Sequence, residues 1–322
     1  MKVYVSQGHE EGIGLEVFFK SCLFLAQDEL KHINLLAFEA GVTETLLSLK
    51  LPFDLHNDFI QLAHVQIPVT WLEVKTHSQS FTALELGMRL SEAGGILYTL
   101  PTSKDQFPNG FAGHTEYFRH FYKKQELGMF FAAPDMQMLL VTDHVAVNNL
   151  SNVLTEERIY SSLVNAHLTL KSWNWPTEKF LVAGLNPHAG ENGLIGTEDT
   201  RVSNAVRRIQ DKYTLDITGP FPGDTMLRER RSAEDVLVYL FHDQGLSLFK
   251  GLQGLIGSNI TLGLPYPRFS PDHGTSFHLF GKNEADYRGC QYSLNQALFQ
   301  LTRMIHGQNS SYQGKSTQPK KR

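Results

Sequence analysis

The chain has 322 residues, of which 41% are hydrophobic and 19% are charged, a composition typical of a folded globular protein rather than a disordered one. The formal net charge of −4 shows no basic excess, so we expect no nucleic-acid partner and no membrane partner. The two cysteines, Cys22 and Cys290, form no CxxC pair, which argues against a disulfide framework and favours a cytoplasmic location. No apolar run is long enough to cross a bilayer, and the first residues lack the pattern of a signal peptide.

Short apolar runs alternate with longer amphipathic segments along the chain, a pattern that favours an α/β fold. The predicted strands lie at residues 3–5, 33–38, 64–67, 96–100, 129–132, 138–141, 180–183, 236–240 and 258–262. The predicted helices lie at residues 12–25, 43–49, 81–93, 115–122, 155–171, 200–212 and 292–305. From Gly307 to Arg322 the chain is polar, and this tail is predicted to be disordered.

Three of the predicted strands run almost directly into a histidine, namely His144, His188 and His242. In open α/β sheets ligands bind beyond the carboxyl ends of the strands, so three imidazoles placed there can converge on one divalent metal. A single strand-end histidine is commonly structural. The loop at 184–193, taken alone, fits a turn with an incidental histidine equally well.

The residues beside these histidines indicate an open metal site. Asp243 follows His242, and a carboxylate beside a ligand imidazole typically fixes its tautomer, so we expect Asp243 to orient rather than to react. No thiolate lies near in the sequence, which disfavours a structural zinc site. Histidine with carboxylate and water ligands suits Zn²⁺, Mn²⁺ or Co²⁺, and Mg²⁺ where waters complete the shell.

Basic and polar residues near the histidines predict an anion pocket. Lys250, Asn259 and Arg268 lie in the segments that follow His242, and lysine and arginine both suit phosphate. His114 stands at the expected start of a helix, where backbone N–H groups also favour an anion. For each of them the alternative is an ordinary solvated surface residue.

A second tight polar loop, Asp272-His273-Gly274-Thr275, is predicted either to hold a nucleotide or to form a simple turn. The glycines at 8–14 have the wrong spacing for the GxGxxG fingerprint that follows a first strand. A Rossmann-type dinucleotide site is therefore not supported.

Five segments together resemble the 4-hydroxythreonine-4-phosphate dehydrogenase family of pyridoxal phosphate biosynthesis. They read GHTEYF, GLNPHAGENGLIGTED, FHDQGLSLFK, NITLGLPYPR and DHGTSFHLFGKNEAD. The resemblance implies an isocitrate/isopropylmalate dehydrogenase-like fold of two α/β/α lobes with a cleft between them, and a homodimer whose active site is shared across the interface. We place the first lobe at residues 1–115 and 276–306, the second lobe at 116–275, and the tail at 307–322.

The resemblance also implies roles for single residues. The metal ligands fall on His144, His188 and His242, and the substrate contacts fall on His114, Thr115, Lys250, Asn259 and Arg268. The loop beside NAD or NADP falls on Asp272, His273, Gly274 and Thr275. The predicted reaction is the metal-dependent oxidation and decarboxylation of 4-phosphooxy-L-threonine with Zn²⁺, Mg²⁺ or Co²⁺. Lys250 or a metal-bound water is the candidate general base.

Two loops depart from the family pattern. Where the family begins GDPAGIGPE, this chain reads GHEEGIGLE at residues 8–16, and the family's TGPxxK loop reads TLPTSK at 99–104. These changes leave open a paralogous dehydrogenase of a phosphorylated sugar acid, 4-phosphoerythronate or 4-phosphothreonate. A metal-dependent hydrolase or lyase, and a binding protein without activity, are further alternatives.

Overall fold

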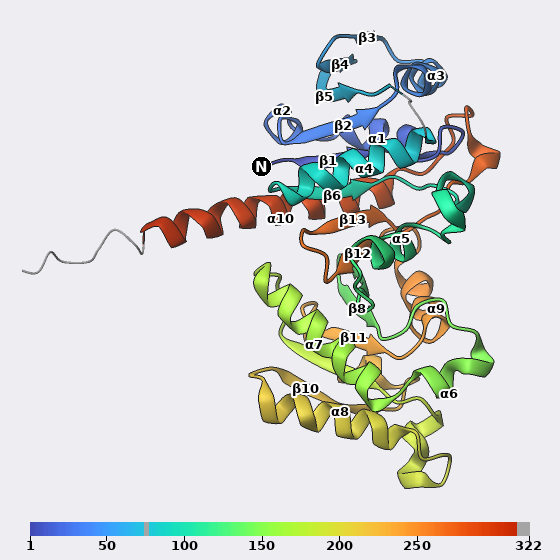
Figure 1. The fold of residues 1–322 in the computed structure, drawn as a ribbon, viewed down its shortest axis with the longest axis vertical. Helices are drawn as coiled ribbons and strands as arrows, with labels where there is room; N and C mark the ends of the chain where they lie inside the picture. Colours follow the sequence, from blue (N-terminus) through green and yellow to red (C-terminus); the bar gives the residue numbers. More distant parts are fainter. Residues whose placement is uncertain (74–76, 314–322) are drawn as a thin grey trace, which may run out of the picture.

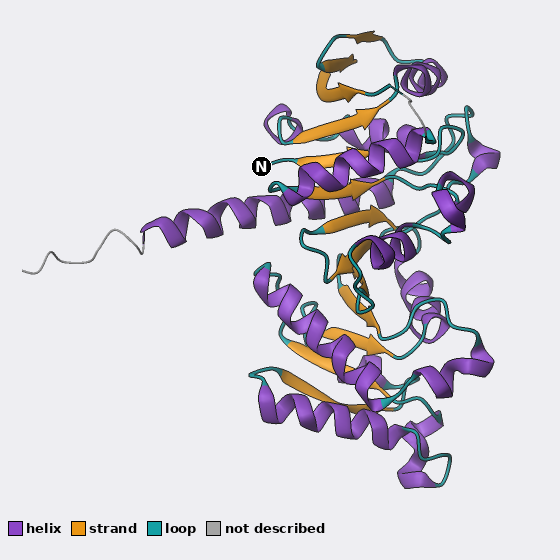
Figure 2. Cartoon of the chain, in the orientation of Figure 1, coloured by secondary structure: helices purple, strands orange, loops and turns teal. Residues whose placement is uncertain are grey.

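The computed structural model describes residues 1–73 and 77–313. Within this part of the chain the strands form one 13-stranded sheet in the order β10-β9-β11-β8-β7-β12-β13-β6-β1-β2-β5-β4-β3 (Figure 1). Helices lie on both sides of it (Figure 2). Among the described helices, none has the length and apolar character needed to span a bilayer.

The strands follow the apolar runs closely. They are β1 (Val3–Ser6), β2 (Ile33–Ala37), β3 (Phe53–Leu55), β4 (Phe59–Leu62), β5 (Val65–Trp71), β6 (Ile96–Thr99), β7 (Gly128–Ala133), β8 (Met136–Leu140), β9 (Lys179–Ala183), β10 (Asp216–Phe221), β11 (Val236–Tyr239), β12 (Ser258–Leu262) and β13 (Arg268–Pro271). All nine predicted strands are confirmed. The sequence analysis missed β3, β4, β10 and β13.

The helices are α1 (Gly14–Cys22), α2 (Gln27–Leu30), α3 (Glu39–Leu49), α4 (Gln79–Glu92), α5 (His114–Phe121), α6 (Leu150–Val153), α7 (Glu156–Ser172), α8 (Asp199–Lys212), α9 (His242–Gln253) and α10 (Arg288–Gln313). Of these, α2, α6 and α9 were not predicted. The long helices α4 and α7 begin where Ser78 and Thr155 accept a hydrogen bond from the third helical backbone N–H, as N-cap residues do.

The sheet consists of two mainly parallel halves joined by antiparallel strands, and β4 and β3 extend one edge in antiparallel pairing. β13, β6, β1, β2 and β5 pair in parallel in one half, and β8, β11, β9 and β10 pair in parallel in the other. Between them β7 and β12 pair with their neighbours in antiparallel fashion. Because β7 and β12 carry the join, the two halves share one continuous sheet.

The core is continuous on one face of the sheet and divided on the other. The large cluster gathers apolar residues of α1, α7, α8 and α10, including Phe18, Leu163 and Leu294. On the opposite side, α9 packs through Phe249 on one half of the sheet, while α4 and α5 pack through a separate cluster on the other half. The divided side leaves a gap between α5 and α9, which the candidate site occupies.

The predicted disordered tail needs a correction at its start. Helix α10 continues to Gln313, so residues 307–313 are helical. The helix end was predicted at 305 because the apolar spacing stops there. Backbone hydrogen bonds do not require apolar side chains, so the helix continues through polar residues. Residues 314–322 of the predicted tail lie outside the described residues.

Helix α9 approaches the sheet too closely for any side chain at Gly245. A Cβ there would lie 2.7 Å from Leu140 Cδ2 and 2.8 Å from Met138 Sδ, whereas a Cβ at Gly251 of the same helix would meet nothing within 4 Å. We expect Gly245→Ala to destabilise the protein by about 1–3 kcal/mol through overpacking, and Gly251→Ala to stabilise it by roughly 0.4–1 kcal/mol. Urea unfolding of both variants measures the difference. Equal effects of the two substitutions would contradict this packing.

Candidate active site

The pairing of β8 with β11 places two of the three predicted histidines together. Beyond the strands, the Val141 and Thr142 backbone N–H groups donate to the carbonyls of Tyr239 and Leu240, at 2.9 and 3.1 Å. His144 and His242 each stand two residues past the last of these pairs. Their ring centroids lie 5.4 Å apart, so both imidazoles face the same space.

Asp243 contacts His242 and not the cleft. Its Oδ1 lies 3.1 Å from His242 Nδ1, and its side chain is 81% exposed. A carboxylate in this place favours the tautomer with the proton on Nδ1 and leaves Nε2 free to bind a ligand. The position fits an orienting role and gives Asp243 no direct access to substrate.

His188 does not join the other two histidines within one chain. It lies in η4 (Pro187–Gly193), where residues 188–192 have left-handed backbone angles, and it lines a separate depression with Asp224 and Tyr239. Its ring is 63% exposed. Consistently, the described residues contain no group of three or more His, Cys, Asp or Glu that would hold a metal. The structure therefore does not bring the three histidines together within a single chain, because the loop with the left-handed run at 188–192 places His188 in the other depression.

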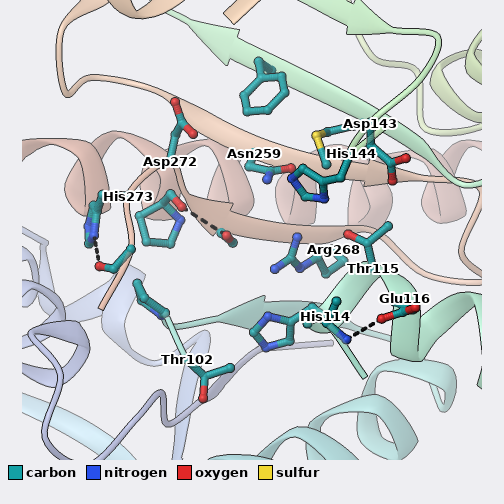
Figure 3. Close-up of a pocket in the computed structure, with 18 of the residues that line it drawn as sticks. Thr102, His114, Thr115, Glu116, Asp143, His144, Asn259, Arg268, Asp272 and His273 are labelled. Atoms are coloured by element: carbon teal, nitrogen blue, oxygen red, sulfur yellow. Dashed lines mark hydrogen bonds between the residues drawn. The ribbon is translucent and has the colours of Figure 1, made fainter. Parts of the chain in front are cut away.

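A cleft of about 580 Å³ adjoins the His144–His242 pair and brings the predicted anion-binding residues together. Helix α9 contributes His242, Leu246 and Lys250, which lie on one face because they are spaced four residues apart. The predicted residues Asn259, Arg268, His114 and Thr115 also line this cleft, and Figure 3 shows them around the same opening as His144.

Arg268 is a buried cation that has no carboxylate partner in the part of the chain that the structure describes. Strand register sets it opposite Thr261, whose Oγ1 accepts from Nη1 at 3.2 Å, while Thr99 Oγ1 accepts from Nε at 3.0 Å. Its exposed fraction is only 4%, and burial lowers its pKa to about 10. A desolvated guanidinium held by neutral hydroxyls is stabilised by a bound anion, and its fork of donors suits phosphate.

His114 stands at the start of α5 beside this guanidinium. Desolvation, and then the charge of Arg268, hold its pKa well below the usual range. The imidazole is therefore neutral near pH 7. It contributes hydrogen bonding rather than positive charge to the cleft.

The loop predicted to adjoin the cofactor borders the cleft next to Lys250. Lys250 Nζ lies 3.4 Å from Asp272 Oδ1, and burial raises the pKa of Asp272 while Lys250 opposes that rise. His273 and Gly274 also line the cleft, whereas the Thr275 carbonyl accepts from the Ile13 N–H. Among the described residues, the buried Nε2 of His273 has no hydrogen-bond partner.

The two loops that depart from the family pattern contact one another. The His9 N–H donates to the Pro101 carbonyl at 2.9 Å, and His9 Nε2 lies 3.2 Å from Gln106 Nε2. Phe277, just past the 272–275 loop, packs edge-on against the His9 ring. The loops that depart from the family pattern therefore contact one another at the place where the loops after β1, β6 and β13 meet.

The sequence analysis missed an ion pair in the cleft wall. Arg119 Nη2 lies 2.7 Å from Asp143 Oδ2, and both residues line the cleft. Asp143 was visible beside His144, but Arg119 lies on α5, and no sequence spacing relates the two.

Comparison with known proteins assigns the chain to a family of dehydrogenases. Residues 27–297 match the model of the family described as pyridoxal phosphate biosynthetic protein PdxA, and the chain belongs to this family. It is 33% identical over 243 residues, 72% of each chain, to the 4-hydroxythreonine-4-phosphate dehydrogenase of Desulfosudis oleivorans. It is 31% identical to a protein of Bradyrhizobium diazoefficiens named "Putative D-threonate 4-phosphate dehydrogenase", over 95% of this chain and 97% of the relative.

A solved structure agrees with this assignment. The 4-hydroxythreonine-4-phosphate dehydrogenase of Klebsiella pneumoniae matches with a TM-score of 0.78 at 25% identity, over 93% of this chain and 99% of that chain. The likeness confirms the predicted isocitrate/isopropylmalate dehydrogenase-like α/β fold. The protein is a PdxA-family dehydrogenase, and a nicotinamide cofactor follows from the family.

The depressed pKa of His114 predicts a pH dependence of stability. Because its folded pKa lies below the unfolded value near 6.5, the unfolded chain takes up a proton first as the pH falls. Stability should be fully present above about pH 6.5 and decline below it, by less than about 1.4 kcal/mol per pH unit for this group, whose ring is partly open to the cleft. We expect His114→Gln to reduce the decline between pH 7 and pH 5 in urea unfolding. The same substitution at the exposed His32 is the control, and an equal reduction there would contradict the assignment.

Proposed function

We propose that the protein oxidises 4-phosphooxy-L-threonine with NAD⁺ or NADP⁺ to 2-amino-3-oxo-4-phosphooxybutanoate, which then loses CO₂ to give 3-amino-2-oxopropyl phosphate, a step of pyridoxal 5'-phosphate (vitamin B6) biosynthesis. The observation that carries the proposal is the buried Arg268, which lacks a carboxylate partner among the described residues and lies in one cleft with the His144–His242 pair. One end of the cleft suits a phosphate and the other suits a metal-chelating group.

The residues at the histidine end fit a divalent metal in part. His144 and His242 face each other, and His242 has Nε2 free, which gives two nitrogen ligands of the kind that Zn²⁺ and Co²⁺ accept. A bound Zn²⁺, Co²⁺ or Mg²⁺ would lower the pKa of the substrate hydroxyl and stabilise the enolate formed on decarboxylation. The third protein ligand in the proposal is His188 of the partner subunit, because His188 is exposed and lines a different depression from the pair in its own chain.

The remaining residues bind and orient the substrate and cofactor. Arg268, His114, Thr115 and Asn259 hold the phosphate, with Arg268 as the only charged donor of the four. Lys250 binds the substrate and is the candidate that takes the hydroxyl proton. The 272–275 loop holds the nicotinamide cofactor, which accepts the hydride.

A phosphorylated hydroxy acid such as 4-phosphothreonate or 4-phosphoerythronate is the second candidate substrate. It shares the phosphate and the oxidised hydroxyl, so the same residues serve it. The match to the Bradyrhizobium diazoefficiens protein over nearly the whole chain favours this candidate, as do the altered loops that meet at His9.

The cytoplasm remains the predicted location.

Absorbance at 340 nm with NAD⁺ or NADP⁺, a divalent metal and each phosphorylated substrate tests the reaction. We expect a metal-dependent rise with 4-phosphooxy-L-threonine, and a rise with the hydroxy acids alone would assign the second candidate. Arg268→Gln should raise the KM of the reactive substrate by roughly 10- to 150-fold, since a hydrogen bond to a charged group contributes about 1.5–3 kcal/mol. Turnover of the substrates without nicotinamide reduction would contradict the proposal and indicate a hydrolase or lyase.

A shared site predicts which pairs of inactive variants complement each other. Co-expressed His188→Ala and Lys250→Ala chains should form hybrid dimers with one intact site, because the intact His188 and the intact Lys250 then meet in one cleft. Activity of the purified hybrid, selected with two different tags, should reach about half that of wild type, which follows from one of two sites.

His144→Ala paired with Lys250→Ala is the matched control. Those two residues line the same cleft of one chain, so every site of that hybrid carries one defect. Equal activity of the two hybrids would argue against His188 acting in the partner's cleft.

A further inference from the structure

The Arg119–Asp143 ion pair lies in the wall of the candidate site. The Arg119 side chain is 21% exposed and that of Asp143 is 15% exposed, so both groups are largely withdrawn from solvent. Asp143 immediately precedes His144. Arg119 lies in α5, five residues after His114, the first residue of that helix.

The backbone that carries His144 is held by the sheet only as far as Thr142. The Thr142 backbone N–H and hydroxyl both donate to the Leu240 carbonyl, at 3.1 and 2.8 Å. Past this residue the chain leaves β11, and the Val145 N–H closes a local turn on the Asp143 carbonyl. Among the described residues, the contact that links the Asp143 side chain to another element is the ion pair with Arg119.

Helix α5 is a firm anchor for this contact. Tyr117 and Phe118 bury its apolar face in the cluster formed with α4, and Phe118 is fully buried. Arg119 therefore projects from a packed helix toward the loop that bears His144, in which Val145 is the residue that packs on the core. The ion pair joins the cluster beneath α5 to the half of the sheet that bears the histidines.

We propose that Arg119 and Asp143 are positioning residues that fix the His144 loop relative to the anion-binding start of α5, and so set the distance between the phosphate end and the metal end of the site. The inference rests on the proposed function. It assigns these two residues no contact with substrate or metal.

The substitution Arg119→Gln separates positioning from simple electrostatics. If the pair acts only through charge, removing Arg119 leaves the Asp143 carboxylate uncompensated beside His144, and a cation should bind more tightly. If the pair positions His144, removing Arg119 frees the loop, and the same cation should bind more weakly. The two accounts therefore predict opposite changes in the dissociation constant of the cation.

Co²⁺ titration of the purified full-length protein by calorimetry, without substrate, measures the sign. We expect Arg119→Gln and Asp143→Asn each to raise the Co²⁺ dissociation constant about tenfold, and the double variant to match either single variant because both remove one contact. Arg119→Lys should restore part of the affinity, since it keeps the charge but loses the planar fork. With the reactive substrate, both single variants should lower kcat as well as raise KM.

Glu157→Gln is the matched control, because it breaks the exposed ion pair with Arg208, 2.9 Å long and remote from the cleft. Tighter Co²⁺ binding by Arg119→Gln, or a dissociation constant within twofold of wild type in both single variants, would overturn the positioning role alone. A wild-type protein that binds no Co²⁺ would overturn the metal-dependent function and this inference together. Thermal unfolding of each variant shows that the folded fraction is the same in the titrations.

Discussion

The parallel pairing of β8 with β11 is the constraint on which the candidate site depends. Backbone hydrogen bonds between the two segments continue past both strands to Thr142 and Leu240, so both segments leave the sheet at the same level. The histidines that follow are far apart in sequence, yet each stands two residues past a member of this last pair. His242 begins α9 and His144 lies in the loop after β8, and their ring centroids come within 5.4 Å of each other. The same pairing fixes the start of α9, and with it Leu246 and Lys250.

The cleft places buried positive charge where the sheet changes from parallel to antiparallel pairing. Arg268 begins β13, between β12 and β6, and its hydrogen bonds go to hydroxyls on both neighbouring strands. Burying a guanidinium without a counter-charge is unfavourable, and the lowered pKa of Arg268 expresses that cost. The negative charge of a bound phosphate would offset this desolvation cost, so phosphate binding would be favoured by the burial of Arg268. The hydroxyl partners matter for the same reason, since a carboxylate in their place would neutralise the site in advance.

Much of the fold could be predicted from the sequence because buried strands in α/β proteins are continuous apolar runs. All nine predicted strands exist, including those before the three histidines. The missed strands show what the pattern lacks: β3 is a three-residue edge strand, β4 beside it has only four residues, β10 contains Gly219-Pro220, and β13 begins with an arginine. The family resemblance assigned His114 and Arg268 to one site. The periodicity of helices and strands could not have related these two residues, because they are far apart in the sequence. Arg119 was predicted neither from periodicity nor from the family resemblance, since an ion pair between a helix and a distant loop follows from tertiary structure alone.

The geometry of His188 explains why one chain does not complete the histidine site. Its loop follows β9, which pairs directly with β11, so the order of the strands does not by itself keep His188 from His242. The left-handed run at 188–192 then turns the chain outward and leaves the imidazole in solvent. Non-glycine residues adopt such angles at a cost of order 1–3 kcal/mol each, and they persist where the surroundings hold them. Here Asp199 supplies that restraint, because its carboxylate accepts from the backbone N–H groups of Leu185 and Asn186 at 2.7 and 3.2 Å. A loop held by a buried carboxylate, whose exposed imidazole lines a depression other than the cleft, fits the proposal that His188 acts in the cleft of a second copy of the chain.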